Sequence, residues 1–112
     1  MIVHFSDAAK QTPEGNTLLE QANEDLKEVV FGRLAEDVTA EWDRTQDASG
    51  RTLYSLKLRN STGEEAENQF TPEELARPRY RQHKMGFLWD DVLKALTHKL
   101  LRQMHEAGNP EK

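Results

Sequence analysis

The spacing of apolar residues changes twice along the chain, and this change limits the possible folds more than any other feature. Residues 18–30 carry apolar side chains at helical spacing. Residues 38–70 alternate between apolar and polar side chains, which is the period of a strand. Helical spacing returns from about residue 80 to residue 107. A chain of 112 residues with this pattern is expected to form one α+β domain.

The first helix has two candidate starting points, Thr12 followed by Pro13, or Asn16. Threonine and asparagine are both capping residues, and proline suits the first helical position. Because Gly15 weakens a helix that includes it, Asn16 is the favoured start. The helix is expected to end between Gly32 and Asp37. Residues 1–12 are expected to be a tail, with a short edge strand formed by Ile2, Val3 and Phe5 as the less favoured alternative. The buried face of the helix is predicted to contain Leu18, Leu19, Ala22, Leu26, Val29 and Val30.

Three strands are predicted over residues 38–44, 52–59 and 64–70, with turns between them. Their polar faces support an antiparallel meander in chain order. The middle strand carries Lys57 and Arg59, and its neighbours carry acids at the matching positions, so opposite charges would face each other across the strands. The acids are Glu41, Asp43, Glu65 and Glu67. The alternative is that the first helix continues to Arg44.

The segment from Thr71 to Glu74 is the clearest local signal in the chain. Thr71 is a helix cap, proline follows at the first helical position, and Glu74 stands where a capping-box carboxylate belongs. This short helix should stop before Pro78. A long helix is then predicted from about residues 80–85 to Ala107, with Gly108 and Pro110 as stop signals.

The expected fold is α+β, a three-stranded antiparallel meander packed on one face by an N-terminal and a long C-terminal helix. The predicted element order is α-β-β-β-α-α. The domain should cover residues 13–108, with tails at 1–12 and 109–112. The core face of the last helix is predicted to contain Met85, Leu88, Trp89, Val92, Leu93, Leu96, Leu100 and Met104.

Two large apolar residues fall on the opposite face of the last helix. Phe87 and Leu101 lie there, with Lys94 and His98 between them. Scattered exposed apolar residues are ordinary, and this is one interpretation. The other is a contact with a partner helix, most simply with a second copy of the chain around a two-fold axis, because one apolar patch is enough for such a contact.

Positive charge is concentrated near the C-terminus. Residues 1–75 hold 7 Lys and Arg against 16 Asp and Glu, whereas residues 76–105 hold 7 Lys and Arg against Asp90 and Asp91. A basic arm after an acidic body predicts that the arm contacts something acidic: the body itself, a second copy or a nucleic acid. Pairing with the body is the favoured interpretation. The candidate contact residues are Arg77, Arg79, Tyr80, Arg81 and Lys84.

The residue content argues against several kinds of chemistry. The chain has no cysteine, which excludes disulfides, thiolate zinc sites and a cysteine nucleophile. Its four histidines, at positions 4, 83, 98 and 105, contain no i, i+4 pair. No glycine-rich phosphate loop or nucleophile-elbow serine occurs. No cofactor, metal or catalytic residue is therefore assigned.

The sequence favours a small cytoplasmic protein that acts as a non-catalytic protein–protein interaction or regulatory module. No apolar run approaches ~18 residues, so no contact with a membrane is expected. One alternative is a nucleic-acid-binding module that uses the basic segment 77–84. A second alternative is a small enzyme whose site has no local sequence motif.

Overall fold

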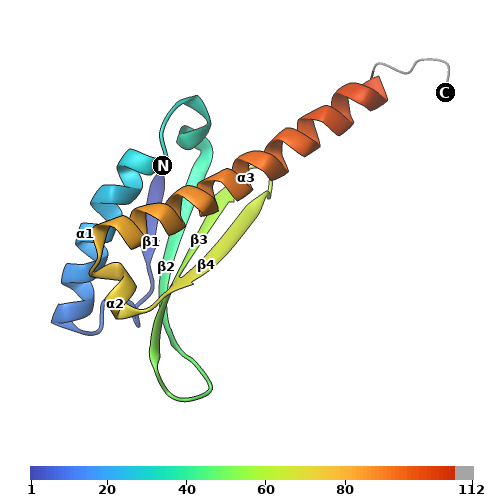
Figure 1. Ribbon diagram of the computed structural model, residues 1–112. Coiled ribbons are helices and arrows are strands. Elements are labelled where there is room, and N and C mark those ends of the chain that lie inside the picture. The colour runs from blue at the N-terminus through green and yellow to red at the C-terminus, as the bar shows by residue number, and fades with distance from the viewer. Residues whose placement is uncertain (108–112) are drawn as a thin grey trace.

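The computed structural model describes residues 1–107, and a single sheet with helices packed on it accounts for most of them (Figure 1). A 3₁₀ helix, η1, lies between the first long helix and the second strand. The elements are β1 (Ile2–Phe5), α1 (Pro13–Val29), η1 (Arg33–Asp37), β2 (Val38–Gln46), β3 (Thr52–Asn60), β4 (Glu65–Phe70), α2 (Pro72–Leu75) and α3 (Pro78–Ala107).

The sheet has four strands in the order β1-β2-β3-β4. Strands β2, β3 and β4 form the expected antiparallel meander, so residues 38–44 are strand and do not continue α1. The structure corrects the predicted sheet in one respect. Residues 2–5, predicted to be part of a tail, add a fourth strand that pairs in parallel with β2, from Ile2 beside Thr39 to Phe5 beside Trp42. Helix α1 supplies the crossover that a parallel pair requires.

One face of the sheet is apolar and carries the core. Helices α1 and α3 pack against it, and the core includes the aromatic pair Trp42 and Phe70, whose ring centroids are 6.0 Å apart. The other face is charged, with Arg59 3.8 Å from Glu41 and 3.1 Å from Glu65. The observed pairing of β2 with β3 and of β3 with β4 confirms the predicted order of these three strands, with the opposite charges facing each other as expected. The fully buried side chains include Leu19, Leu26, Val38, Trp42, Leu56, Leu58, Phe70, Met85, Leu88 and Val92.

Helix α1 begins earlier than expected, at Pro13 and not at Asn16. The hydroxyl of Thr12 accepts a hydrogen bond from the backbone N–H of Gly15 at 3.0 Å, which caps the first turn. Gly15 is buried against the hydroxyl of Tyr54, and a Cβ atom at this position would lie 2.6 Å from that oxygen. The close contact between α1 and Tyr54 on β3 therefore explains why this helical position holds a glycine.

The capping box at Thr71 is confirmed. The Thr71 hydroxyl accepts from the N–H of Glu74 at 3.1 Å, and the Glu74 carboxylate accepts from the N–H of Thr71 at 2.9 Å. Helix α3 starts at Pro78, earlier than the predicted residues 80–85. Proline is tolerated at the start of a helix because the N–H groups of the first turn take no part in helical hydrogen bonds. The N–H of Arg81 donates to the carbonyl of Arg77, just before Pro78.

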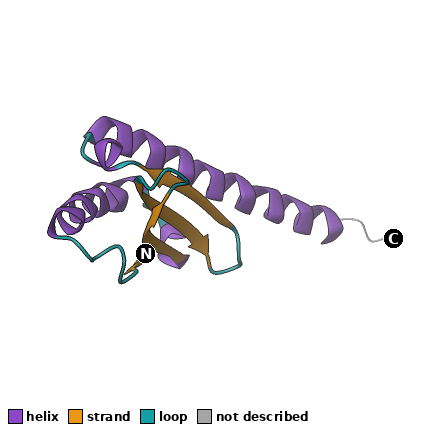
Figure 2. Cartoon of the chain, turned by 90° about the horizontal axis from the view of Figure 1, so that it is seen from below, coloured by secondary structure: helices purple, strands orange, loops and turns teal. Residues whose placement is uncertain are grey.

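Helix α3 extends past the end of the sheet (Figures 1 and 2). Its last buried side chain is Leu96, and its last polar contacts with the body are those of Lys99 with the β3–β4 turn. Leu100 and Met104, predicted to lie in the core, are 50% and 68% exposed because no strand lies under this part of the helix. The predicted stop signals Gly108 and Pro110, and the tail 109–112, lie outside the described residues.

Candidate functional site

Large apolar side chains that remain exposed are concentrated on α3. Within residues 1–107, five of the eight such side chains belong to this helix, and the other three lie on β1, η1 or the loop between α1 and η1. The five are Tyr80, Phe87, Leu100, Leu101 and Met104. The large exposed apolar side chains of the described residues are thus gathered on the helix that also packs against the sheet.

Phe87, Lys94, His98 and Leu101, the residues predicted to form a partner interface, all lie on the exposed face of α3. Phe87 is 67% exposed and Leu101 is 56% exposed. A seven-residue step along an α-helix ends about 20° short of two full turns, so Phe87, Lys94 and Leu101 follow one line. We call this line, with His98 beside it, the α3 seam. It faces directly away from the buried side of the helix.

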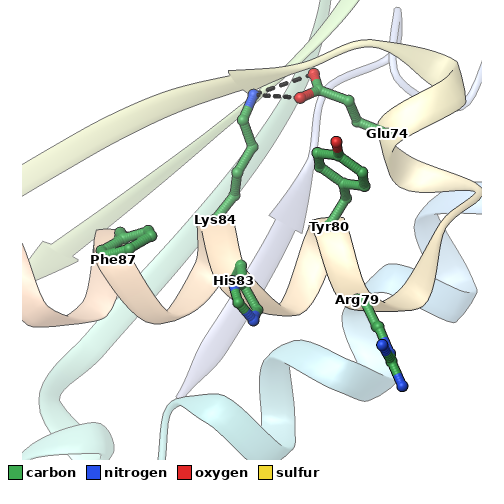
Figure 3. A pocket seen from close by; sticks show the side chains of 6 residues that line it. All are labelled: Glu74, Arg79, Tyr80, His83, Lys84 and Phe87. Carbon is green, nitrogen blue, oxygen red and sulfur yellow. Dashed lines mark hydrogen bonds and ion pairs between the residues drawn. The ribbon is translucent and has the colours of Figure 1, made fainter.

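A shallow groove of about 550 Å³ lies at the N-terminal end of the α3 seam. Tyr80, His83 and Phe87 line it from α3, and Glu74 closes it from α2 (Figure 3). Tyr80 and Phe87 stand on either side of Lys84, whereas Arg79 points away from Glu74. The groove is therefore aromatic at both ends and charged in the middle.

Glu74 and Lys84 form the polar wall of this groove. The Lys84 ammonium lies 3.0 Å from the Glu74 carboxylate, donates to the carbonyl of Gln69 at 2.6 Å, and lies 5.2 Å from the centre of the Phe70 ring. Partial burial raises the pKa of Glu74. Hydrogen bonds from the Thr71 N–H and the Lys84 ammonium outweigh this effect, so the pKa lies below its ordinary value. Glu74 is therefore a stable anion that fixes Lys84 in place.

The basic segment is divided between the interior and the surface. Arg81 is buried, forms an ion pair with Asp25 on α1, and donates to the carbonyl of Leu75 at 2.9 Å, so it joins all three helices. Arg77 and Arg79 are exposed, and the Arg77 guanidinium lies 5.9 Å from the centre of the Tyr80 ring. The structure thus brings Arg79, Tyr80 and Lys84 to one groove, while Arg81 faces away from it.

Sequence reasoning missed two residues of the groove, His83 and the carboxylate of Glu74. Glu74 was assigned a capping role alone, and His83 was considered as a metal ligand and as part of the basic segment 77–84 but was not named as a contact residue. The spacing of residues 80, 83 and 87 places them on one face of a helix, and this signal could have found His83. Glu74 reaches the groove only because α2 turns back onto α3, which no local pattern indicates.

Within residues 1–107, no three His, Asp or Glu side chains gather in an arrangement that could hold a metal ion. None of the helices in the same range is long and apolar enough to cross a membrane. Comparison of the chain with known protein families, curated proteins and solved structures finds no match.

Proposed function

We propose that this protein is a non-catalytic interaction or regulatory module that binds a protein partner, either a second copy or another chain, through the exposed face of α3. A cytoplasmic location is part of the proposal. The observation that carries it is the exposure of Tyr80, Phe87 and Leu101 on the helix face that points away from the core. Full burial of a large apolar side chain contributes ~1.5–3 kcal/mol, and these three, which are exposed over half to two-thirds of their surface, would each contribute part of that to binding.

The contacts of the basic segment favour a protein partner over a nucleic acid. Arg81 and Lys84 are engaged with Asp25 and Glu74, so two of the cations predicted to meet phosphate already have carboxylate partners. Asp90 and Asp91 follow on exposed positions of the same helix and would repel a phosphate backbone.

The carboxyl groups give little support to an enzyme. A general acid or base needs a pKa moved toward the working pH. The pKa of Glu74 is shifted away from neutrality, and the pKa of Asp47 is also lowered, first by a hydrogen bond from the Ser49 hydroxyl and then by the N–H of Arg51. Both side chains are therefore carboxylates that hydrogen bonds hold in their charged form.

Site-specific photo-crosslinking in the cells of origin tests the proposal. A photoreactive residue in place of Phe87 should yield one discrete protein adduct, and a second substitution, Leu101→Asp, should abolish it. The matched control places the same reagent at Glu20, which is exposed on α1. Equal adducts from both positions, or none from position 87, would contradict the proposal. Fractionation of the same cells checks the location.

A further inference from the structure

We propose that the partner is a second copy of this chain, and that the two α3 helices pack antiparallel around a two-fold axis that passes beside Lys94. The inference rests on the proposed function, since it names the partner of the same surface. It goes further because it fixes the direction of the helices and the residues that meet.

The apolar residues of the α3 seam are placed symmetrically about Lys94. Phe87 stands seven residues before it and Leu101 seven residues after it, all on one line of the helix surface. A two-fold axis beside Lys94 therefore sets Phe87 of each copy against Leu101 of the other. One chain supplies both halves of the contact, which is the condition for a closed dimer.

The polar groups beside the seam are complementary under the same symmetry. Asp91 stands three residues before Lys94 and His98 four residues after it, and both project from the same side of the seam. In the antiparallel arrangement, the Asp91 carboxylate of one copy, a hydrogen-bond acceptor, therefore faces the His98 imidazole of the other, which carries an N–H donor. The two Lys94 side chains meet at the axis, where each lies one helical turn from an aspartate of its own chain. Each copy thus supplies the acceptor for the donor of the other.

A parallel arrangement of the same two helices lacks this complementarity. Residues beside the contact line of two parallel helices face the opposite side of the partner's line, so Asp91 of one copy would not meet His98 of the other. The positions of these polar groups therefore select the antiparallel direction.

The part of α3 that lies beyond the sheet gives an independent reason for this arrangement. Residues 97–105 of one copy would lie along residues 83–91 of the other, and that half of α3 packs on the sheet. The two helices would be in contact over about 33 Å. Each unsupported helix end thus rests on the supported half of its partner, and Leu101 reaches the Phe87 end of the groove.

The register can be tested by exchanging charges. One variant carries Asp90→Lys and Asp91→Lys, and the other carries His98→Asp. Each variant alone should associate at least about tenfold more weakly than the unchanged chain, because His98→Asp sets two carboxylates opposite each other and the lysine variant leaves His98 without its acceptor. An equimolar mixture should form a heterodimer with near-original affinity, since both contacts are then complementary. Sedimentation equilibrium of the full chains measures all three cases, and heterodimer formation also shows that both variants are folded.

Because the chain contains no cysteine, a single introduced cysteine can test directly where the two-fold axis lies. Lys94→Cys should form a disulfide-linked dimer under mild oxidation. The matched control, Gln82→Cys, should not, because residue 82 is exposed on α3 away from the seam. In the antiparallel pair the two Phe87 positions are about 21 Å apart, too far for a disulfide, whereas in a parallel pair they adjoin. Trapping of Phe87→Cys with itself would therefore overturn the antiparallel direction.

A monomeric mass at ~100 μM would overturn the second copy as partner. A dimer that does not respond to the charge exchange would overturn the register. Neither result decides whether α3 binds a protein, since an adduct with a different protein from position 87 would keep the proposed function and remove only this inference.

Discussion

Gly15 shows how one residue can connect two distant elements. It occupies the first turn of α1, where the hydroxyls of Tyr54 and Thr12 lie 2.6 and 2.8 Å from the position that a Cβ atom would take. The sequence suggested that this glycine lies outside the helix, because glycine is a poor helix former. Tyr54 is 39 residues away along the chain, so no local pattern could show that the position must have no side chain.

Two glycine-to-alanine substitutions should therefore have opposite effects on stability. Gly15→Ala should lower the free energy of unfolding by about 1–3 kcal/mol, because the new Cβ atom displaces the buried Tyr54 ring and the Thr12 cap. Gly86→Ala, in the middle of α3 with open space around it, should raise it by about 0.5–1 kcal/mol. Urea denaturation measures both. A smaller cost of Gly15→Ala in a Tyr54→Phe background would identify the Tyr54 hydroxyl as the cause.

Arg81 differs from the other arginines of its segment for a reason that the sequence does not contain. Its carboxylate partner, Asp25, lies 56 residues away on α1. The sequence favoured pairing of the basic arm with the acidic body. It could not say which arginine would be buried, because burial depends on how α1 crosses α3.

Breaking this ion pair should cost far more than breaking an exposed pair next to it. Asp25→Ala leaves the Arg81 guanidinium buried without its carboxylate and should lower the free energy of unfolding by ~3 kcal/mol. Glu24→Ala removes only the exposed pair with Lys27 and should change it by less than ~0.5 kcal/mol. Thermal or urea unfolding compares the two. Similar losses for both variants would mean that Arg81 finds another partner.

At the scale of the elements, α3 shows what helical periodicity can and cannot predict. It correctly separated Met85, Leu88 and Val92, which are buried, from Phe87 and Leu101, which are exposed. It also placed Leu100 and Met104 in the core, because the pattern continues after the sheet has ended. Periodicity shows which residues share a face, whereas the length of the neighbouring strands decides how much of that face is covered.

The junction between α2 and α3 should make stability depend on pH. The pKa of Glu74 in the folded protein lies below its ordinary value of 4.5, so the charged group stabilises the fold above about pH 4.5. That contribution is lost as the pH falls through the lowered pKa. Glu74→Gln, which keeps an acceptor for the cap but loses the charge, should be less stable than the unchanged chain by about 1 kcal/mol at pH 7.

The difference between these two proteins should shrink below pH 4.5, which urea denaturation at a series of pH values measures. Glu73→Gln is the matched control, because Glu73 is exposed in the same turn. A difference that stays constant down to pH 3 would mean that the charge of Glu74 does not stabilise the junction.

At the scale of the whole molecule, the meander was predictable and the first strand was not. The alternation over residues 38–70 and its charge pairs are properties of neighbouring segments. Strand β1 has only four residues, and it finds its place beside β2 after a crossover through α1. Its partly buried side chains, Val3 and Phe5, resemble those of any short apolar tail.

The division of charge was a correct guide to how the molecule is held together. Three ion pairs join the basic arm to acidic parts of the chain: Arg81 with Asp25, Lys84 with Glu74, and Lys99 with Glu64. The residues of the seam could be assigned to one face from spacing alone. The groove beside them could not, since it is formed where α2 meets α3.

The dynamics of α3 should report whether its free end has a partner. An isolated helix of about 12 residues is marginal in water, so amides after Lys99 should exchange rapidly with solvent in a single chain. Phe87→Asp, which changes the seam outside the measured segment, should keep the chain monomeric and leave residues 100–105 unprotected. The unchanged chain at high concentration should protect them, because the second copy covers them.

Residues 85–96 should be protected in both proteins, since they pack on the sheet. Hydrogen exchange measured by mass spectrometry compares the two segments, and full protection of residues 100–105 in the monomeric variant would mean that the end of α3 is stable without a partner.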